Sequence, residues 1–361
     1  DNGTMSEAEY NKVCKDYIDE SLYSTSANSD GTVNISGFKS STPSSYKNNV
    51  WALPTKIDGK TVTGISTGSF AQKGISSKLI ISPTIKTIDS NSFVSNSILA
   101  LALPDSVTSI GATSFTGNSI SSLNVPESVE TIGENAFNSN NISRLTLNEG
   151  IKNIENHSFA NNSFKTLKLP DSLTTVGIAF NGTPIETLDT GGGFKITMEA
   201  FYSHKSTLKS LTIGSDTLKT EQTFDDAAFQ NFTKLESVTV RNNVKTLSTQ
   251  LFELDSSLTS VTLPDTMQNI GDYAFNKCFS LREVKLPNGL INIGKFAFSN
   301  MDLRTITIPG TVTTIGGYSF YNNSNLDTIN DNSGLSTCDM VSSNTTINNK
   351  KTNTSLTCTS N

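Results

Sequence analysis

Short segments of apolar residues recur along this chain, and within each segment apolar and polar positions alternate. Ile120–Val125 and Leu281–Leu286 are two examples, and both have the pattern Leu/Ile-x-x-Leu/Val/Ile-x-Leu/Ile/Val. The alternation at the end of each segment places successive apolar side chains on one face, as in a half-buried β-strand. Each segment therefore predicts one strand, whose intervening residues face outward.

A phenylalanine follows each strand segment and is preceded by Ala or Ser in most copies. These residues recur about every 23 residues, at intervals of 21–28, which is the range of leucine-rich repeats. No single repeat can bury its own ring, so the rings are expected to stack into a phenylalanine spine inside a solenoid. The predicted spine consists of Phe70, Phe93, Phe115, Phe137, Phe159, Phe180, Phe201, Phe229, Phe252, Phe275, Phe298 and Phe320.

Proline and glycine separate the pieces of each repeat. Proline lacks a backbone N–H group and ends strand pairing, so the chain is expected to turn after each strand. Such prolines are Pro54, Pro104, Pro126, Pro170, Pro264, Pro287 and Pro309. A second corner is predicted where a positive φ or a close approach of neighbouring coils favours glycine. These glycines are Gly111, Gly133, Gly177, Gly271, Gly294 and Gly316.

The third residue after the spine phenylalanine completes a recognisable pattern. It is Asn96, Asn118, Asn140, Asn162 or Cys278, and such side chains can satisfy backbone groups of a neighbouring turn. With the Leu-Pro, Ile-Gly and Ala-Phe dipeptides, this pattern resembles the BspA-like leucine-rich-repeat family over about residues 46–330. The resemblance implies a surface protein, bacterial in most cases, that adheres to host matrix proteins or other cells. It implies no catalytic residues.

The predicted fold is a leucine-rich-repeat solenoid, α/β or mainly β, with about 12 coils and a parallel sheet. We expect a capping helix and lead-in over residues 1–45, the solenoid over 46–330, and an irregular cap or linker over 331–361. Ser6 and Glu9 form a capping box. An amphipathic helix running through Leu22 is predicted to cover the first coil. Its apolar stripe consists of Met5, Val13, Cys14, Tyr17, Ile18 and Leu22.

The four cysteines do not form a metal-binding motif, because no two are a few residues apart and the chain has only two histidines. Cys14 and Cys278 are expected to be buried thiols. Cys338 and Cys358 flank a polar C-terminal stretch and could close it as a disulfide. No zinc site and no cofactor is predicted.

Charge and hydropathy argue against two classes of partner. The net charge is −6 and lysine and arginine do not cluster, which argues against a nucleic-acid-binding protein. No apolar run approaches the roughly 18 residues of a membrane helix. Because the sequence begins with Asp1, we expect any signal peptide or anchor to lie outside it.

Other conspicuous residues have a structural interpretation. His157 and His204 have no carboxylate or cysteine partners in the repeat, and Asp225–Asp226 reads as loop charge. Gly191–Gly193 lacks the spacing of a phosphate loop. The repeat period falters between Val176 and Phe229, and this stretch is either an insertion that bends the stack or a binding loop.

The outward positions of the strand segments form the one extended candidate surface, which we call the strand-face ladder. It is mostly polar, and its threonines either stabilise the sheet or contact a partner. The candidate partner-binding residues are Asn124, Arg144, Thr146, Lys168, Thr212, Thr239, Thr262, Arg282, Lys285, Arg304 and Thr307. We hypothesise a non-enzymatic, secreted or cell-surface module that binds a protein, such as host extracellular matrix. The alternative is a structural spacer that displays another domain.

Overall fold

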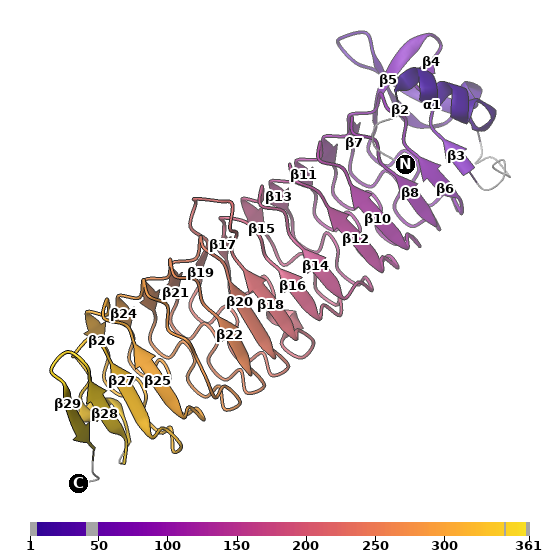
Figure 1. Ribbon diagram of the computed structural model, residues 1–361. Coiled ribbons are helices and arrows are strands. Elements are labelled where there is room, and N and C mark those ends of the chain that lie inside the picture. The colour runs from indigo at the N-terminus through magenta and orange to yellow at the C-terminus, as the bar shows by residue number, and fades with distance from the viewer. Residues whose placement is uncertain (1–5, 41–49, 343, 359–361) are drawn as a thin grey trace. The chain divides into compact units, whose positions relative to one another are not determined.

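A computed structural model describes residues 6–40, 50–342 and 344–358 (Figure 1). The chain is a mainly β, parallel-strand solenoid of about 12 coils, as predicted. It divides into two compact units, which we describe separately. Unit 1 comprises Asp1–Lys165 and Ser172–Pro184, and unit 2 comprises Thr166–Asp171 and Ile185–Asn361.

Unit 1 contains two rows of parallel strands. The predicted row consists of β3 (Val50–Ala52), β6 (Lys78–Ile80), β8 (Ala100–Ala102), β10 (Ser122–Val125) and β12 (Arg144–Leu147). The second row consists of β5 (Lys60–Ile65), β7 (Thr87–Ile88), β9 (Ser109–Ile110), β11 (Thr131–Ile132), β13 (Asn153–Ile154) and β15 (Thr175–Val176). The strands of this second row pair continuously in sequence order.

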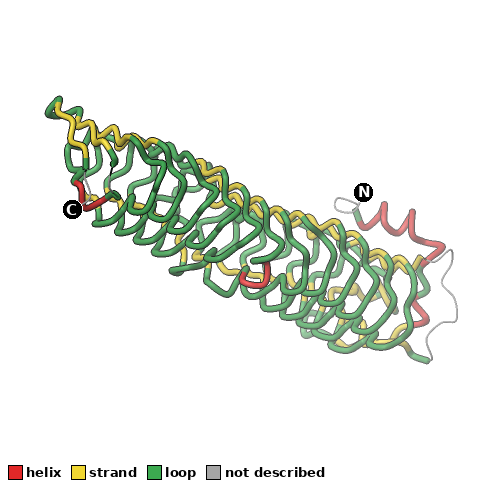
Figure 2. Tube along the Cα trace, turned by 90° about the horizontal axis from the view of Figure 1, so that it is seen from below, coloured by secondary structure: helices red, strands yellow, loops and turns green. Residues whose placement is uncertain are grey.

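Unit 2 repeats this arrangement. Its predicted row consists of β14 (Thr166–Lys168), β16 (Thr187–Asp189), β18 (Ser210–Ile213), β20 (Ser237–Val240), β22 (Ser260–Thr262) and β25 (Thr305–Ile308). Two strands that were not predicted, β27 (Thr328–Asp331) and β28 (Thr346–Asn349), extend this row. Its second row consists of β17 (Lys195–Ile196), β19 (Thr223–Phe224), β21 (Thr246–Leu247), β23 (Asn269–Ile270), β24 (Asn292–Ile293) and β26 (Thr314–Ile315). Loops connect the rows in each coil (Figure 2).

The second row was not predicted, because its strands are only two residues long in most coils. In the sequence, the corner glycines predict a turn at these residues and no strand. In the structure the first residue of such a pair is partly or fully exposed and the second is mostly buried, as at Asn269 and Ile270. Each such pair forms parallel hydrogen-bonded pairing with the corresponding pair of the next coil, and this pairing makes the two residues a strand.

The phenylalanine spine is confirmed in both units. From Phe70 to Phe180, in unit 1, successive ring centroids lie 5.1–5.8 Å apart with stacked planes. From Phe201 to Phe320, in unit 2, the spacing is 5.5–6.3 Å. All of these rings are buried. Each ring thus packs against the rings of adjacent coils, and the core of each unit exists only through stacking.

The corner glycines allow neighbouring coils to approach closely, and a positive φ is not the reason for them. A Cβ atom on Gly133 would lie 2.7 Å from the backbone nitrogen of Ala112. One on Gly294 would lie 2.5 Å from the backbone nitrogen of Asp272. The positive φ occurs two residues later, for example at Asn135. Of the two predicted reasons for glycine at this corner, only close approach is correct.

At the N-terminus the helix α1 spans Glu7–Cys14 and begins with the predicted capping box of Ser6 and Glu9. The predicted extension to Leu22 is wrong. The chain continues as two 3₁₀ turns, Lys15–Tyr17 and Glu20–Leu22, and the extended Asp19 between them caps the second with its side chain. An aspartate that bonds nearby backbone N–H groups competes with helix continuation.

The apolar stripe of this helix also differs from the prediction. Val13 is exposed, whereas Tyr10 is buried and its hydroxyl donates a hydrogen bond of 2.8 Å to the carbonyl of Leu53. Met5 and the predicted boundary at residues 45 and 46 lie outside the described residues. The helix is followed by the antiparallel pair β1 (Tyr23–Ala27) and β2 (Val33–Phe38), and β2 pairs in parallel with β5. The short β4 (Lys56–Ile57) pairs with β5 in antiparallel orientation.

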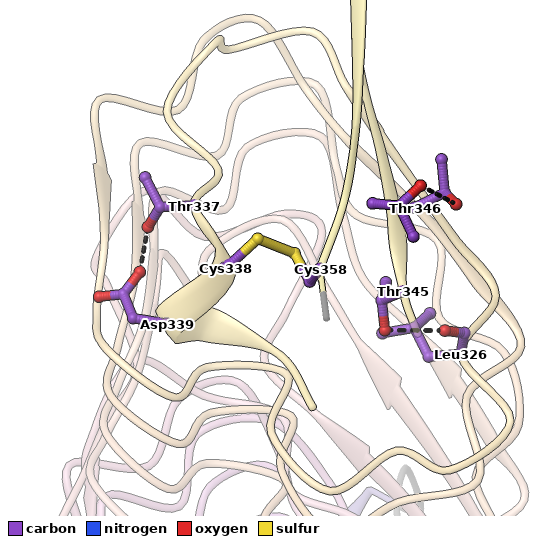
Figure 3. Close-up of a disulfide and its surroundings, with 8 residues drawn as sticks. Leu326, Thr337, Cys338, Asp339, Thr345, Thr346 and Cys358 are labelled. Carbon is purple, nitrogen blue, oxygen red and sulfur yellow. Dashed lines mark hydrogen bonds between the residues drawn. A yellow bond between two sulfur atoms is a disulfide. The ribbon is translucent and has the colours of Figure 1, made fainter. Parts of the chain in front are cut away.

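A disulfide fastens the C-terminal part of unit 2. Cys338, at the start of the 3₁₀ turn Cys338–Met340, is bonded to Cys358, and their Cα atoms lie 5.4 Å apart (Figure 3). Between them, β28 turns into the antiparallel β29 (Thr354–Thr357). This is the disulfide that the sequence left open. Cys14 and Cys278 are buried free thiols, as predicted.

Candidate interaction surface

In unit 1 the strand-face ladder consists of exposed side chains on two paired strands. Asn124 in β10 lies in register with Thr146 in β12, and Arg144 begins β12. All three are exposed. The amide of Asn148 donates a hydrogen bond of 2.9 Å to Oδ1 of Asn124. The parallel register thus aligns these predicted residues on one face.

In unit 2 the ladder is continuous over five strands. Lys168, Asp189, Thr212, Thr239 and Thr262 are successive register partners in β14, β16, β18, β20 and β22. Lys168, Thr239 and Thr262 are exposed, and Thr212 and Asp189 are half-buried. The structure therefore brings four predicted candidates into one row.

The carboxylate in this row is already neutralised. The two terminal nitrogens of Arg241 donate hydrogen bonds of 3.0 and 2.9 Å to the two carboxylate oxygens of Asp189. Two-point contacts of this kind fix both planar groups. Because Arg241 follows β20, two strands further along the row, the ion pair spans the strand between them. The free charge on this part of the ladder is therefore the ammonium group of Lys168.

The ladder is interrupted at Leu281–Pro287, which the sequence predicts as a strand. This segment does not pair with β22 or β25, so the prediction of a strand here is wrong. Lys285 lines two hollows. One has a volume of about 310 Å³ and is also lined by Thr305 and Thr307. The other has a volume of about 260 Å³ and is also lined by Thr262. The alternation buries Val284 and Leu286 as expected, but backbone hydrogen bonds to the neighbouring coils are missing within this described segment.

The remaining predicted residues lie around this interruption. Arg282 is exposed and its Nε donates a hydrogen bond of 2.8 Å to Oδ2 of Asp302 in the next coil. Arg304 and Thr307 are exposed, and Thr307 lies in register with Asn330 in β27. The interruption therefore separates Thr307 from the row that ends at Thr262.

The irregular stretch is held by polar contacts within unit 2. Oδ1 of Asp171 accepts a hydrogen bond of 2.9 Å from the backbone N–H of Gly192, and its Oδ2 accepts bonds from the hydroxyls of Ser215 and Thr217. Hydrogen bonds to the carboxylate lower the pKa of Asp171, although burial opposes them. The side-chain amide of Gln222 donates a hydrogen bond of 2.8 Å to the carbonyl of Gly191. Gly191 and Gly192 both have a positive φ, so these contacts fix a glycine-dependent turn.

The other conspicuous residues occupy structural positions. His204, three residues after Phe201, is buried with Nδ1 3.3 Å from the carbonyl of Phe201. His157 has a φ of 57° at a turn. Asp225 forms an ion pair with Lys195 at 2.5 Å, which lowers the pKa of the Asp225 carboxyl. Over residues 6–40, 50–342 and 344–358, no three His, Cys, Asp or Glu side chains are placed to hold a metal ion.

Unit 2 also carries a partly exposed aromatic surface that was not predicted. Tyr273, Phe296 and Tyr318 each lie two residues before a spine phenylalanine, and their rings stack at 5.0 and 5.1 Å. Tyr321 contacts Tyr318 edge to face at 5.6 Å. We call these four residues the aromatic strip. The sequence could have indicated this surface, because three successive repeats have an aromatic residue at the same position.

Sequence comparison agrees with this repeat geometry. The model of the BspA type leucine rich repeat region, built from six copies, matches residues 63–180, 132–259 and 251–360. These overlapping matches cover most of the chain. The chain belongs to the BspA-type leucine-rich-repeat family. The family is defined by its repeat.

Several solved structures resemble this BspA-type chain. A leucine-rich repeat protein from Bacteroides ovatus is 22% identical, with 86% of this chain and 93% of that chain covered and a TM-score of 0.43. The pneumococcal vaccine antigen PcpA is 18% identical, with 90% of each chain covered and a TM-score of 0.41. A leucine rich cell surface protein from Faecalibacterium prausnitzii is 18% identical, with 86% and 93% covered and a TM-score of 0.39. Among curated proteins, no sequence matches.

The helices of this BspA-type chain are short. Within the part of the chain that the structure describes, none has the length and apolar character needed to cross a bilayer.

Proposed function

We propose that this BspA-type chain is a non-enzymatic, secreted or cell-surface module that binds a protein partner through its strand-face ladder. One observation carries the proposal. Among the described residues, the hydroxyls of Thr146, Thr212, Thr239, Thr262 and Thr307 take part in no hydrogen bond. Each lies on a parallel strand and does not bond along the stack, so all five hydroxyls are available to a partner.

The arrangement supports contact over an area and offers little for a small molecule. The two hollows beside Lys285 are shallow, whereas the row from Lys168 to Thr262 crosses five paired strands. A non-obligate protein interface is about as polar as the rest of a protein surface, so a polar ladder is compatible with one. Names of similar structures include a vaccine antigen and a cell surface protein. Host extracellular matrix is the partner class that we propose.

A binding assay with matched variants tests this proposal. The chain would be passed over immobilised collagen, fibronectin and laminin, and affinity would be measured for the wild type and for Thr239→Arg with Thr262→Arg. Both positions are exposed, so the substitutions are expected to leave folding unchanged and to weaken binding at least tenfold. Thr246→Arg, exposed on the other row in β21, is the control. Absence of binding to all three proteins would favour the alternative, a spacer that displays another domain.

A further inference from the structure

We propose that the aromatic strip of unit 2 is a second interaction surface, which binds an acidic, apolar segment of a partner protein. This surface is distinct from the strand-face ladder. Tyr273, Phe296 and Tyr318 each lie three residues beyond the end of β23, β24 and β26. These strands occupy the side of the coil opposite β25 and β27 (Figure 1). A ligand on the strip would therefore not contact the ladder.

The rings form an ordered array, in which Tyr273 and Phe296 are half-buried and Tyr318 and Tyr321 are exposed. Successive planes are nearly parallel, at 9° and 13°, and the two contacts of about 5 Å align three coils. Tyr318 is 49% exposed and Tyr321 is 43% exposed. Such aromatic side chains bury large areas with little loss of rotamer freedom, and they are enriched among residues that dominate binding energy. The stack is thus preorganised for binding.

The backbone at these positions is unfavourable for aromatic residues. Tyr273, Phe296 and Tyr318 have φ values of 59°, 54° and 59°, a left-handed conformation that is strained for bulky side chains. Other coils use smaller or polar residues at the same position and keep the same fold, namely Asn91, Thr113, Asn135, His157, Ala227 and Gln250. The fold does not require the aromatic rings, so their presence in three successive coils indicates a role in recognition.

Ring geometry and charge define the partner. Stacking covers ring faces and leaves ring edges outward, and the edge of an aromatic ring carries partial positive charge. Lys295 immediately precedes Phe296, and Lys277 follows Tyr273 by four residues; neither forms an ion pair within the described ranges. Two carboxylates adjoin the strip, and both accept hydrogen bonds. Asp272 accepts one of 2.7 Å from the backbone N–H of Lys295. Asp339, whose backbone carbonyl accepts a hydrogen bond from the N–H of Tyr318, accepts one on its carboxylate from the hydroxyl of Thr337. Carboxylates beside apolar side chains fit this surface.

A peptide selection tests the proposal without a known partner. A random 12-residue peptide library displayed on phage would be selected on the purified chain, and enriched peptides would be synthesised for affinity measurement. We expect sequences that combine Asp or Glu with apolar residues. Phe296→Asn and Tyr318→Asn should weaken their binding at least tenfold. Asparagine occurs at this position in other coils, so both variants are expected to fold, which circular dichroism and thermal unfolding would verify.

The control is the strand-face variant Thr239→Arg with Thr262→Arg, which should bind the peptides normally. Lys295→Glu should weaken the binding of acidic peptides while leaving the rings in place. Three outcomes would overturn the inference: no enriched peptide, enrichment without acidic residues, or affinities that the asparagine variants do not change. The chain would also be tested on a glycan array. If it binds there and the same asparagine variants abolish this binding, the partner is a carbohydrate and the proposal of a protein partner is wrong. Because the ladder and the strip have separate variants, failure of one proposal is distinguishable from failure of the other.

Discussion

In most coils, the side chain three residues after the spine phenylalanine bonds to the backbone of the preceding coil, whereas Phe232 and Met301 hold this position in two coils. Oδ1 of Asn118 accepts a 3.0 Å hydrogen bond from the N–H of Ile98, and its amide nitrogen donates 3.0 Å bonds to the carbonyls of Phe93 and Phe115. Asn96, Asn140, Asn162 and Asn323 repeat this geometry. An amide suits the site because it accepts on one atom and donates on the other.

Asp255 occupies the same position and lacks the donor. Its Oδ1 accepts a 2.7 Å hydrogen bond from the N–H of Phe232, and its buried Oδ2 has no hydrogen-bond partner among the described residues. Burial raises the pKa of the Asp255 carboxyl well above its ordinary value, and the hydrogen bond from Phe232 and the positive charge of Lys205 do not offset it. The buried thiol of Cys278 interacts with this carboxyl. The protonated acid is the form that this site accommodates.

Replacing Asp255 with asparagine should therefore stabilise unit 2 in a pH-dependent way. A carboxyl whose pKa is raised by folding contributes its full stability below its unfolded pKa of about 3.9, and it loses this contribution as the pH rises. We expect Asp255→Asn to gain about 1–3 kcal/mol at pH 7 and much less at pH 4. Urea unfolding at both pH values measures the difference. The converse variant, Asn323→Asp, should be destabilised more at pH 7 than at pH 4, and equal effects at both values would contradict the interpretation.

The corner glycines permit a second prediction at this scale. Gly294→Ala would place a Cβ atom against the backbone of Asp272, which cannot move independently of its coil. We expect a loss of about 1–3 kcal/mol in the free energy of unfolding. Gly317→Ala is the control, because no atom lies within 4 Å of its added Cβ. Thermal denaturation of both variants would reveal the contrast, and similar melting temperatures would argue against close approach as the reason for glycine.

At the scale of elements, the two ends of the chain use different structures. The helix α1 packs through Tyr10 and Cys14 beside Ala52 in unit 1. In unit 2, β28 and β29 form an antiparallel pair that the Cys338–Cys358 disulfide fastens. All four residues of β29 are exposed. With so little buried apolar surface, β29 depends on its hydrogen bonds and on the covalent link.

Removal of the disulfide should consequently loosen the C-terminal pair while the rest of the protein stays folded. The bond joins residues 20 positions apart, and a loop of about this size stabilises by roughly 3 kcal/mol in the chain-entropy account. Hydrogen exchange of a Cys338→Ser, Cys358→Ser variant is expected to accelerate over residues 344–358. Exchange over residues 100–160 should not change. A uniform acceleration in both regions would show that the disulfide stabilises more than this pair.

For the molecule as a whole, repetition means that each coil depends mainly on its neighbours. Within unit 1, Phe93, Phe115, Phe137 and Phe159 stack with nearly parallel planes, and the Asn position is the same in each of these coils. One coil can therefore replace the next without changing any contact type. The chain should tolerate changes in coil number better than changes in coil length.

Deletion of a whole coil tests this expectation. Removing residues 115–136 moves Phe137 into the place of Phe115 and preserves both strand rows, so we expect a folded protein with a modest decrease in melting temperature. Removing only residues 115–125 places a second-row strand against a first-row strand and should prevent cooperative folding. Circular dichroism with thermal unfolding distinguishes the two. Equal stability of both deletions would be inconsistent with nearest-neighbour stacking.

The sequence by itself determined the repeat period, the spine, the inward and outward positions of the main strands and the family. Each of these depends on alternation, on a side chain that recurs in every coil, such as Phe137, or on one that recurs in several coils, such as Asn140, and local patterns encode them. The capping box at Ser6 was also readable, because it needs residues only three positions apart.

Only the tertiary structure decided features that depend on contacts between coils. Pairing made strands of two-residue segments such as Asn269–Ile270, and its absence left Leu281–Pro287 outside the sheet despite a perfect pattern. Arg241 neutralises Asp189 from 52 positions away, and the rings of the aromatic strip meet only because coils stack. Such contacts arise from the spacing of neighbouring backbones, which no single repeat specifies.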